Sequence, residues 1–318
     1  MNRQFTNNLL AYLSSMRLYA APVSVAAGII GLVNYPAANL VRLIIILAVL
    51  FFGWGINQVV NDYLGQKEDL HNAPKRPLVS GQLNLNFAVW LSASLFILGL
   101  ILSFILNPRS CLIYVFVFLL NIIYQKKKHL PLLGNIIFGL LLAPCVYYAA
   151  ICANPQNTFS IFLNSRIAAM SILVWQINFL LCFYSDFKDY QGDKKADIKT
   201  FVVALGTQKA SIIGLLLLSI PFSCFFYFSL IANQTGINPF SLMLIIAAGI
   251  MLFYQAIVFI ILPAQQKEIT NLKWFSLGVI IFETAIAALV SGRLALLTGV
   301  ISFILAELIF LLNKKYLA

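Results

Sequence analysis

Ten long apolar stretches, separated by short polar connections, limit what this 318-residue chain can fold into more than any other feature. They cover residues 13–34, 39–60, 87–106, 110–124, 133–153, 165–185, 208–232, 240–262, 273–291 and 294–313. A helix needs about 20 mostly apolar residues to cross a bilayer core about 30 Å thick. Charged residues make up only 10% of the chain, whereas a soluble domain carries about 25%. We therefore predict an all-α, polytopic membrane bundle of nine to ten transmembrane helices, with residues 1–318 forming one domain.

The positions of the basic residues, which give the chain a net charge of +11, indicate membrane topology and not a surface for nucleic acid. Basic residues gather in alternate connections, while the connections between them carry single arginines near the end of an apolar stretch. Because cytoplasmic loops are enriched in Lys and Arg, the basic connections are expected to face the cytoplasm. Both termini then lie on that side, which requires an even number of spans and favours ten over nine. A bacterial inner membrane is the expected location, since no organelle-targeting extension precedes the first stretch.

Acidic residues are rarer and far more clustered. The chain has ten, and seven of them fall in two of the basic connections, within residues 62–69 and 186–197. Charge beside a membrane is costly unless it is paired or coordinates a ligand, so both clusters are candidate functional sites. Ordinary solvated loops, the alternative interpretation, would mix acids and bases without regular spacing.

The second acidic segment follows the sixth apolar stretch. If that helix continues past the membrane face, Asp186, Asp189 and Asp193 share one side of it and repel one another. The chain has only two histidines, so oxygen atoms are the available metal ligands, and oxygen ligands favour Mg²⁺ or a similar hard cation. Because Mg²⁺ usually bridges to substrate phosphates, we expect a diphosphate here, with Lys188 and Lys194 neutralising its remaining charge.

The first acidic segment follows the second apolar stretch. Asp62 and Asp69 are seven residues apart, which is two helical turns, and are expected on one helical face. Asn61 adds a neutral oxygen ligand. Lys75 and Arg76 follow closely and can contact diphosphate oxygens, the arginine through two parallel hydrogen bonds.

The two acidic segments also carry a family resemblance. Residues 61–81 resemble the first aspartate-rich motif of the UbiA superfamily of intramembrane prenyltransferases, and residues 186–206 resemble the second. Tyr124 and the lysine run 126–128 are similar to the family's connection between its fourth and fifth helices. Arg17 resembles a position common in the family, although it could equally be an anchor at the membrane interface.

The resemblance implies a role for each of these residues. The catalytic aspartates would be Asp62, Asp69, Asp189 and Asp193. The metal ligands would be Asn61, Asp62, Asp69, Asp186, Asp189 and Asp193. The diphosphate would be bound by Arg17, Lys75, Arg76, Tyr124, Lys127, Lys128, Lys188 and Lys194.

The resemblance also implies an activity and its partners. The bundle would surround a central, lipid-accessible cavity in which two Mg²⁺ ions hold a polyprenyl diphosphate. Ionisation of the donor gives an allylic carbocation that an acceptor captures. An aromatic acceptor of the lipoquinone type is expected. The alternatives are a glycerol-phosphate lipid, a tetrapyrrole, capture within the donor chain as in a terpene cyclase, or a non-catalytic scaffold that binds or transports lipid.

Gly65 departs from the family pattern, because it stands where the family has the middle aspartate of its first motif. Glycine supplies no side-chain ligand. Glu68 could reach into the site instead, Asp62 and Asn61 could suffice with additional water, or the site could be altered. Two further acids, Glu283 and Glu307, lie within late apolar stretches and are expected to face the cavity or to pair internally.

Overall fold

The computed structural model describes residues 3–232, 237–262 and 269–317. Within these residues all regular structure is helical, and nine segments are long and apolar enough to cross a membrane. They are α3 (Leu40–Leu64), α5 (Leu85–Leu106), α6 (Ser110–Lys127), α7 with α8 (Leu133–Leu142 and Pro144–Ala153), α10 (Ser165–Lys195), α12 (Thr207–Tyr227), α13 (Pro239–Ile261), α14 (Ile269–Ala288) and α15 (Gly292–Leu317). The chain is therefore an integral membrane protein with nine candidate spans in its described part, as the apolar stretches predict.

The first apolar stretch is broken in two. Helix α1 (Arg3–Ser15) ends before a bend at residues 16–21, and α2 (Pro22–Asn34) begins at a proline, which suits the first turn of a helix. With 13 residues, α2 is only about 20 Å long. The chain would have ten spans only if α2 also crossed the membrane.

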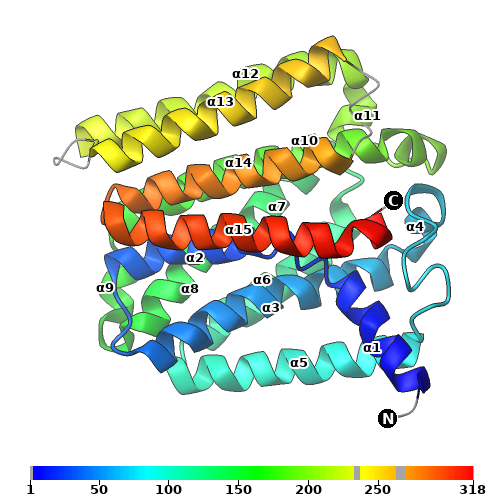
Figure 1. Ribbon diagram of the computed structural model, residues 1–318, viewed down its shortest axis with the longest axis horizontal. Helices are drawn as coiled ribbons and strands as arrows, with labels where there is room; N and C mark the ends of the chain where they lie inside the picture. Colours follow the sequence, from blue (N-terminus) through cyan, green and yellow to red (C-terminus); the bar gives the residue numbers. More distant parts are fainter. Residues whose placement is uncertain (1–2, 233–236, 263–268, 318) are drawn as a thin grey trace.

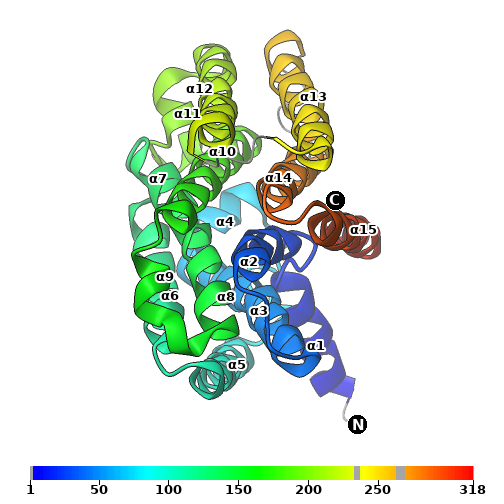
Figure 2. The ribbon, with the colours of Figure 1, turned by 90° about the vertical axis from the view of Figure 1, so that its left-hand side faces the viewer.

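The spans run side by side along one direction (Figure 1). Viewed from the end, α2 lies in the middle of the bundle and packs against α3, α8, α14 and α15 (Figure 2). Gly31 permits the close approach of α2 and α8, because a Cβ at this position would collide with the backbone of Val146 and Ala150. Fully buried side chains of the large apolar core lie on the central helices α2, α8 and α14, on α10, and also on α12 and α13.

Asparagine side chains mark where several of the spans begin. The residues are Asn39, Asn84, Asn164 and Asn238, which start α3, α5, α10 and α13. Each side-chain oxygen accepts a hydrogen bond from a backbone N–H of the first turn. These N–H groups have no partner within the helix, so the caps stabilise the helix starts.

The short helices α4 (Gln66–Asn72) and α11 (Phe201–Leu205) lie at one end of the bundle, beside the end of α10 (Figure 1). Helix α1 crosses the spans obliquely and packs on α3 and α5, where the Tyr12 hydroxyl lies 2.9 Å from the Ser92 hydroxyl. Helix α9 (Thr158–Phe162) lies at the opposite end. Both acidic segments are therefore at the same end of the bundle.

Candidate active site

A cavity of about 700 Å³ lies at this end of the bundle. Its walls come from α3, α4, α6, α7, α10, α14 and α15, together with the bend before α2. The acidic segments line it through Asn61, Asp62, Asp69, Asp186, Asp189 and Asp193. The structure thus brings all six expected metal-ligand candidates into one cavity.

The first acidic segment is split between two helices. Helix α3 ends at Leu64 and α4 begins at Gln66, so Asp62 and Asp69 do not share one helix, and the expectation of two turns on a single face is wrong. The chain turns at Gly65, whose carbonyl accepts the Asp69 N–H at 3.0 Å. Arg76 joins the two acids again: its Nη1 lies 3.3 Å from Asp62 Oδ1 and forms an ion pair with Asp69. Burial alone would lower the pKa of Arg76, but Asp62 and Asp69 raise it above the ordinary value, so the guanidinium stays charged.

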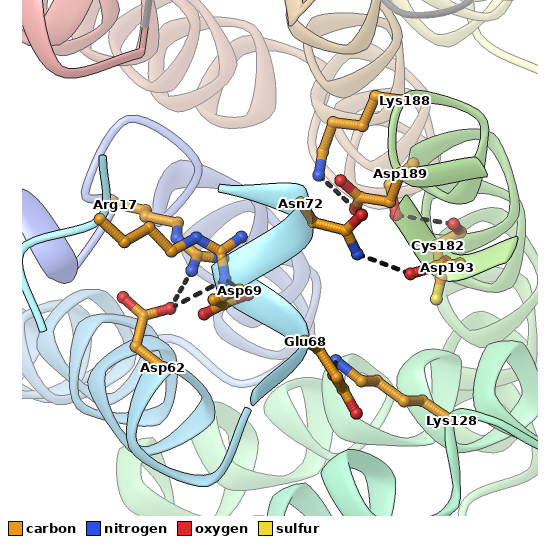
Figure 3. A network of polar contacts seen from close by, with 12 residues as sticks. Arg17, Asp62, Glu68, Asp69, Asn72, Lys128, Cys182, Lys188, Asp189 and Asp193 are labelled. Carbon is orange, nitrogen blue, oxygen red and sulfur yellow. Dashed lines mark hydrogen bonds and ion pairs between the residues drawn. The ribbon is translucent and has the colours of Figure 1, made fainter. Parts of the chain in front are cut away.

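Arg17 also reaches Asp62, from the bend between α1 and α2. It forms an ion pair with Asp62 (Figure 3). It also donates a hydrogen bond to Gln58 Oε1 at 2.9 Å. Its φ of 47° lies in the left-handed region, which costs energy for a residue other than glycine. Arg17 lines the cavity and contacts the acidic site, which favours a role at the substrate over that of an anchor at the membrane interface.

The second acidic segment lies on a single helix, as its spacing predicts. Helix α10 continues without a break to Lys195, and Asp186, Asp189 and Asp193 all face the cavity. The Asp186 carboxylate accepts a hydrogen bond from Asn135 Nδ2 at 3.0 Å. Asp189 is paired with its neighbour Lys188, whose Nζ is 2.5 Å from Oδ2.

Asn72 connects the two acidic segments. Its side chain, at the end of α4, donates to Asp193 Oδ1 on α10 at 2.6 Å (Figure 3). Gly192 makes room for this contact, because a Cβ there would overlap the side-chain oxygen Oδ1 of Asn72. The glycine beside Asp193 therefore lets α4 lie directly against α10.

The oxygen atoms in the cavity fit a magnesium-bound diphosphate. Within residues 61–72, four buried side-chain oxygens have no hydrogen-bond partner in the described part of the chain: Asn61 Oδ1, Asp62 Oδ2, Asp69 Oδ2 and Asn72 Oδ1. Within the same residues, no three His, Cys, Asp or Glu side chains lie close enough together to hold a metal ion by themselves. This is compatible with Mg²⁺, which takes one or two carboxylates and completes its octahedron with water and phosphate oxygens.

Gln125 of α6 occupies the space next to Gly65. A Cβ added to Gly65 would collide with the Gln125 amide nitrogen. Glu68 does not line the cavity; it forms an ion pair with Lys128 and accepts a long hydrogen bond of 3.5 Å from Gln125. The structure therefore disfavours Glu68 as the replacement for the missing aspartate.

The expected diphosphate-binding residues separate into two groups. Those that line the cavity are Arg17, Lys75, Arg76, Tyr124, Lys128 and Lys188. Lys127 and Lys194 are exposed and lie outside it. Adjacent residues on a helix point about 100° apart, so Lys128 and Asp193 face the cavity while Lys127 and Lys194 face away.

Gln58, Gln125 and Lys273 are among the polar residues of the cavity that the sequence interpretation missed. Gln58 precedes Asp62 by one helical turn, so the spacing could have identified it. Gln125 and Lys273 carry no comparable signal. Of the two late acids, Glu283 is fully buried and accepts a hydrogen bond from Asn178 at 2.7 Å, whereas Glu307 pairs with Lys273.

A smaller apolar chamber adjoins the cavity. The two share Trp54, Gln58 and Phe138 as lining residues. The chamber continues between α3, α5, α6 and the α7–α8 pair, past Gly53 and Tyr114. An apolar compartment thus lies next to the charged one.

Two acidic segments thus meet in one cavity of a membrane bundle, and the match to a known family agrees with this arrangement. The UbiA prenyltransferase family model matches residues 21–277. The chain belongs to the UbiA prenyltransferase family. It is therefore a prenyltransferase, and the resemblance noted in the two acidic segments is confirmed.

Individual family members agree in sequence and in fold. Digeranylgeranylglyceryl phosphate synthase from Thermococcus kodakarensis is 27% identical over 282 residues, which cover 84% of this chain and 93% of that protein. A UbiA homologue from Aeropyrum pernix has the same fold, with a TM-score of 0.70 at 17% identity over 85% of this chain and 96% of that one. A UbiA homologue from Archaeoglobus fulgidus bound to GPP and Mg²⁺ gives a TM-score of 0.63 at 16% identity, covering 88% and 99% of the two chains.

Proposed function

We propose that this UbiA prenyltransferase transfers a prenyl group from a polyprenyl diphosphate to a glycerol-phosphate lipid, with Mg²⁺ as cofactor. The observation that supports it most is the meeting of Asp62 and Asp69 with Asp189 and Asp193 in one cavity, beside unpartnered oxygen atoms. The relative from Thermococcus kodakarensis supports the acceptor, because its product is a glyceryl phosphate carrying two prenyl groups. It favours the glycerol-phosphate lipid over the aromatic acceptor expected from the sequence.

The cations of the cavity suit the departing diphosphate. Arg17, Arg76 and Lys188 each contact an aspartate of the acidic segments. When Mg²⁺ is bound it neutralises these carboxylates and polarises the phosphate oxygens. The three side chains are then available to donate hydrogen bonds to the diphosphate, where negative charge grows as the C–O bond breaks.

The apolar chamber suits the rest of the donor. Its shared residues Trp54 and Phe138 lie between the charged cavity and the apolar interior. We infer that the prenyl tail occupies the chamber, with its first unit near these rings. Aromatic faces stabilise nearby positive charge, and an apolar compartment excludes the water that would otherwise capture the cation.

We also propose that the cavity faces the cytoplasm. Exposed lysines surround this end of the bundle: Lys67, Lys126, Lys127, Lys194, Lys195 and Lys199. The enrichment of basic residues on the cytoplasmic side of membrane proteins supports this orientation.

Prenyl transfer by the purified protein in nanodiscs tests the proposal. Labelled geranyl, farnesyl and geranylgeranyl diphosphates would be offered, with and without Mg²⁺, to a mono-prenylated glycerol-phosphate lipid, to an aromatic acid, to a tetrapyrrole and to no acceptor. We expect Mg²⁺-dependent product only with the glycerol-phosphate lipid. Product from the aromatic acid or the tetrapyrrole would move the enzyme to that acceptor class. A cyclic hydrocarbon formed without acceptor would identify a terpene cyclase, and the absence of Mg²⁺-dependent donor binding would indicate a non-catalytic scaffold.

A further inference from the structure

One cation of the cavity is not associated with the acidic segments. Lys273, near the start of α14, lines the cavity together with Ser276 and Leu277 of the same helix and with Ala306 and Phe310 of α15. The aspartates come from α3, α4 and α10. Lys273 therefore belongs to a different wall of the same cavity.

Lys273 is held by a short ion pair and two aromatic rings. Its Nζ is 2.6 Å from Glu307 Oε2, and it lies 5.0 Å from the centre of the Trp274 ring and 4.9 Å from that of Phe310. The side chains of Lys273 and Glu307 are 13% and 24% exposed. The second carboxylate oxygen of Glu307 is buried and has no hydrogen-bond partner in the described part of the chain.

The partner of Lys273 distinguishes it from other paired cations of the cavity. Arg17, Arg76, Lys128 and Lys188 pair with acids of the two motif segments. Glu307 belongs to neither segment, and α15 lies beyond the residues that match the family model. Binding of Mg²⁺ and diphosphate at the aspartates would therefore leave the Lys273–Glu307 pair unchanged.

An acceptor that carries a phosphate needs a second anion site. Its phosphate and the donor diphosphate repel each other, so the acceptor headgroup has to be held by a cation that the donor does not use. A lysine ammonium offers three donors and can exchange one carboxylate partner for phosphate oxygens. Leu277, Ile280 and Ala306 provide apolar surface beside it for the lipid part of the acceptor.

We propose that Lys273 binds the phosphate of the glycerol-phosphate acceptor and that Glu307 is the counter-ion which positions the ammonium until that phosphate replaces it. This inference rests on the proposed function and adds the acceptor subsite to it. The diphosphate is bound at the aspartates, the acceptor phosphate at the α14–α15 wall, and the acceptor hydroxyl between them.

Steady-state kinetics in nanodiscs test the subsite with two acceptors, a mono-prenylated glycerol phosphate and the same lipid without its phosphate. The variants are Lys273→Met, Lys273→Arg and Glu307→Gln, with Lys209→Met as a control because Lys209 is exposed on α12 and does not line the cavity. We expect Lys273→Met to raise the KM of the phosphorylated acceptor about tenfold to hundredfold, as for the loss of a charged hydrogen bond. The donor KM and the rate with the dephosphorylated lipid should stay within about twofold of wild type, since the lost interaction is with the phosphate alone.

The remaining variants separate binding from a structural role. Lys273→Arg should keep most of the preference for the phosphorylated acceptor, and Glu307→Gln should lower its KM because the competing carboxylate is removed. If Lys273→Met loses activity equally with both acceptors and is also less stable to heat, the ion pair only holds α15 against α14. That result would overturn the inference. If the wild-type enzyme uses an aromatic acceptor instead, the proposed function itself fails. If it uses the phosphorylated lipid and Lys273→Met retains the wild-type preference, only the acceptor subsite fails.

Discussion

The two acidic segments line the same cavity but are built differently. The second lies on one continuous helix, so the positions of Asp186, Asp189 and Asp193 follow from the helical repeat of α10 alone. The first is broken at Gly65, and Arg76 holds its two aspartates together across the break. A site built on one helix depends on that helix, whereas a site built on two depends on contacts between elements. The first segment should therefore be the more sensitive to changes elsewhere in the bundle.

Removing one carboxylate from each segment should have the largest effect. We expect Asp69→Asn and Asp193→Asn each to reduce turnover by about 10³-fold, because each loses a charge that the metal and the diphosphate require. Asp197→Asn is the matched control, since Asp197 is exposed and outside the cavity, and its φ of 55° suits asparagine. Labelled-product formation at saturating substrate measures the effect. Activity close to wild type in either cavity variant would show that its segment is dispensable.

The contact between the segments can be broken without removing any charge. Gly192→Ala places a Cβ where the Asn72 side chain lies, so either this side chain has to leave Asp193 or α4 has to move away from α10. Because a displacement of about 1 Å can cost 10²-fold in rate, we expect a 10- to 100-fold lower kcat. Gly249→Ala on α13 is a control, as its Cβ would meet Phe222 at an ordinary 3.4 Å. Unchanged kcat and Mg²⁺ dependence for Gly192→Ala would mean that the two segments act independently.

Of the two helices that lead into the acidic segments, only α3, which precedes the first, also lines the apolar chamber. Gly53 lies on α3 less than three turns before Asp62, and a Cβ at this position would point toward Tyr114, 3.9 Å away. Gly53→Leu should partly fill the chamber and shift donor preference toward shorter prenyl diphosphates by about tenfold in kcat/KM. Competition between labelled geranyl and geranylgeranyl diphosphates measures this shift. An equal decrease for both donors would place the tail elsewhere.

Restoring the family's aspartate at the break should change activity least. In Gly65→Asp the new side chain competes with Gln125 for space, and overpacking costs about 1–3 kcal/mol. We expect lower thermal stability and turnover within about threefold of wild type. The double variant Gly65→Asp/Gln125→Ala should recover the stability. A large gain in Mg²⁺ affinity from Gly65→Asp alone would mean that this position is a ligand site after all.

The sequence was most informative where the helical repeat alone determines position. The nine candidate spans of the described residues, the continuity of α10 and the inward direction of its three aspartates follow from length and spacing. The same repeat misplaced Asp69, because it carries no information about a break that depends on local backbone geometry at Gly65.

Contacts between helices could not be predicted in the same way. Gln125 beside Gly65, Asn72 on Asp193 and Glu307 on Lys273 each join residues far apart in the chain. Membrane helices are apolar on nearly every face, so the pattern of polar and apolar residues does not tell which helices are neighbours. That information depends on the close packing of small and large side chains, as where Gly31 meets α8.

The position of α15 affects the order in which the enzyme is assembled during synthesis. The rings of Phe310 and Tyr19 pack edge to face, with centres 5.5 Å apart, and both residues line the cavity. Since chains emerge from the ribosome N-terminus first, the aspartates are in the membrane well before the last wall exists. Until α15 has been made and inserted as far as residue 310, the cavity lacks the wall that α15 forms beside α14. Early helices must therefore remain folded beside lipid for most of translation, and the cavity acquires its last wall only in the final step.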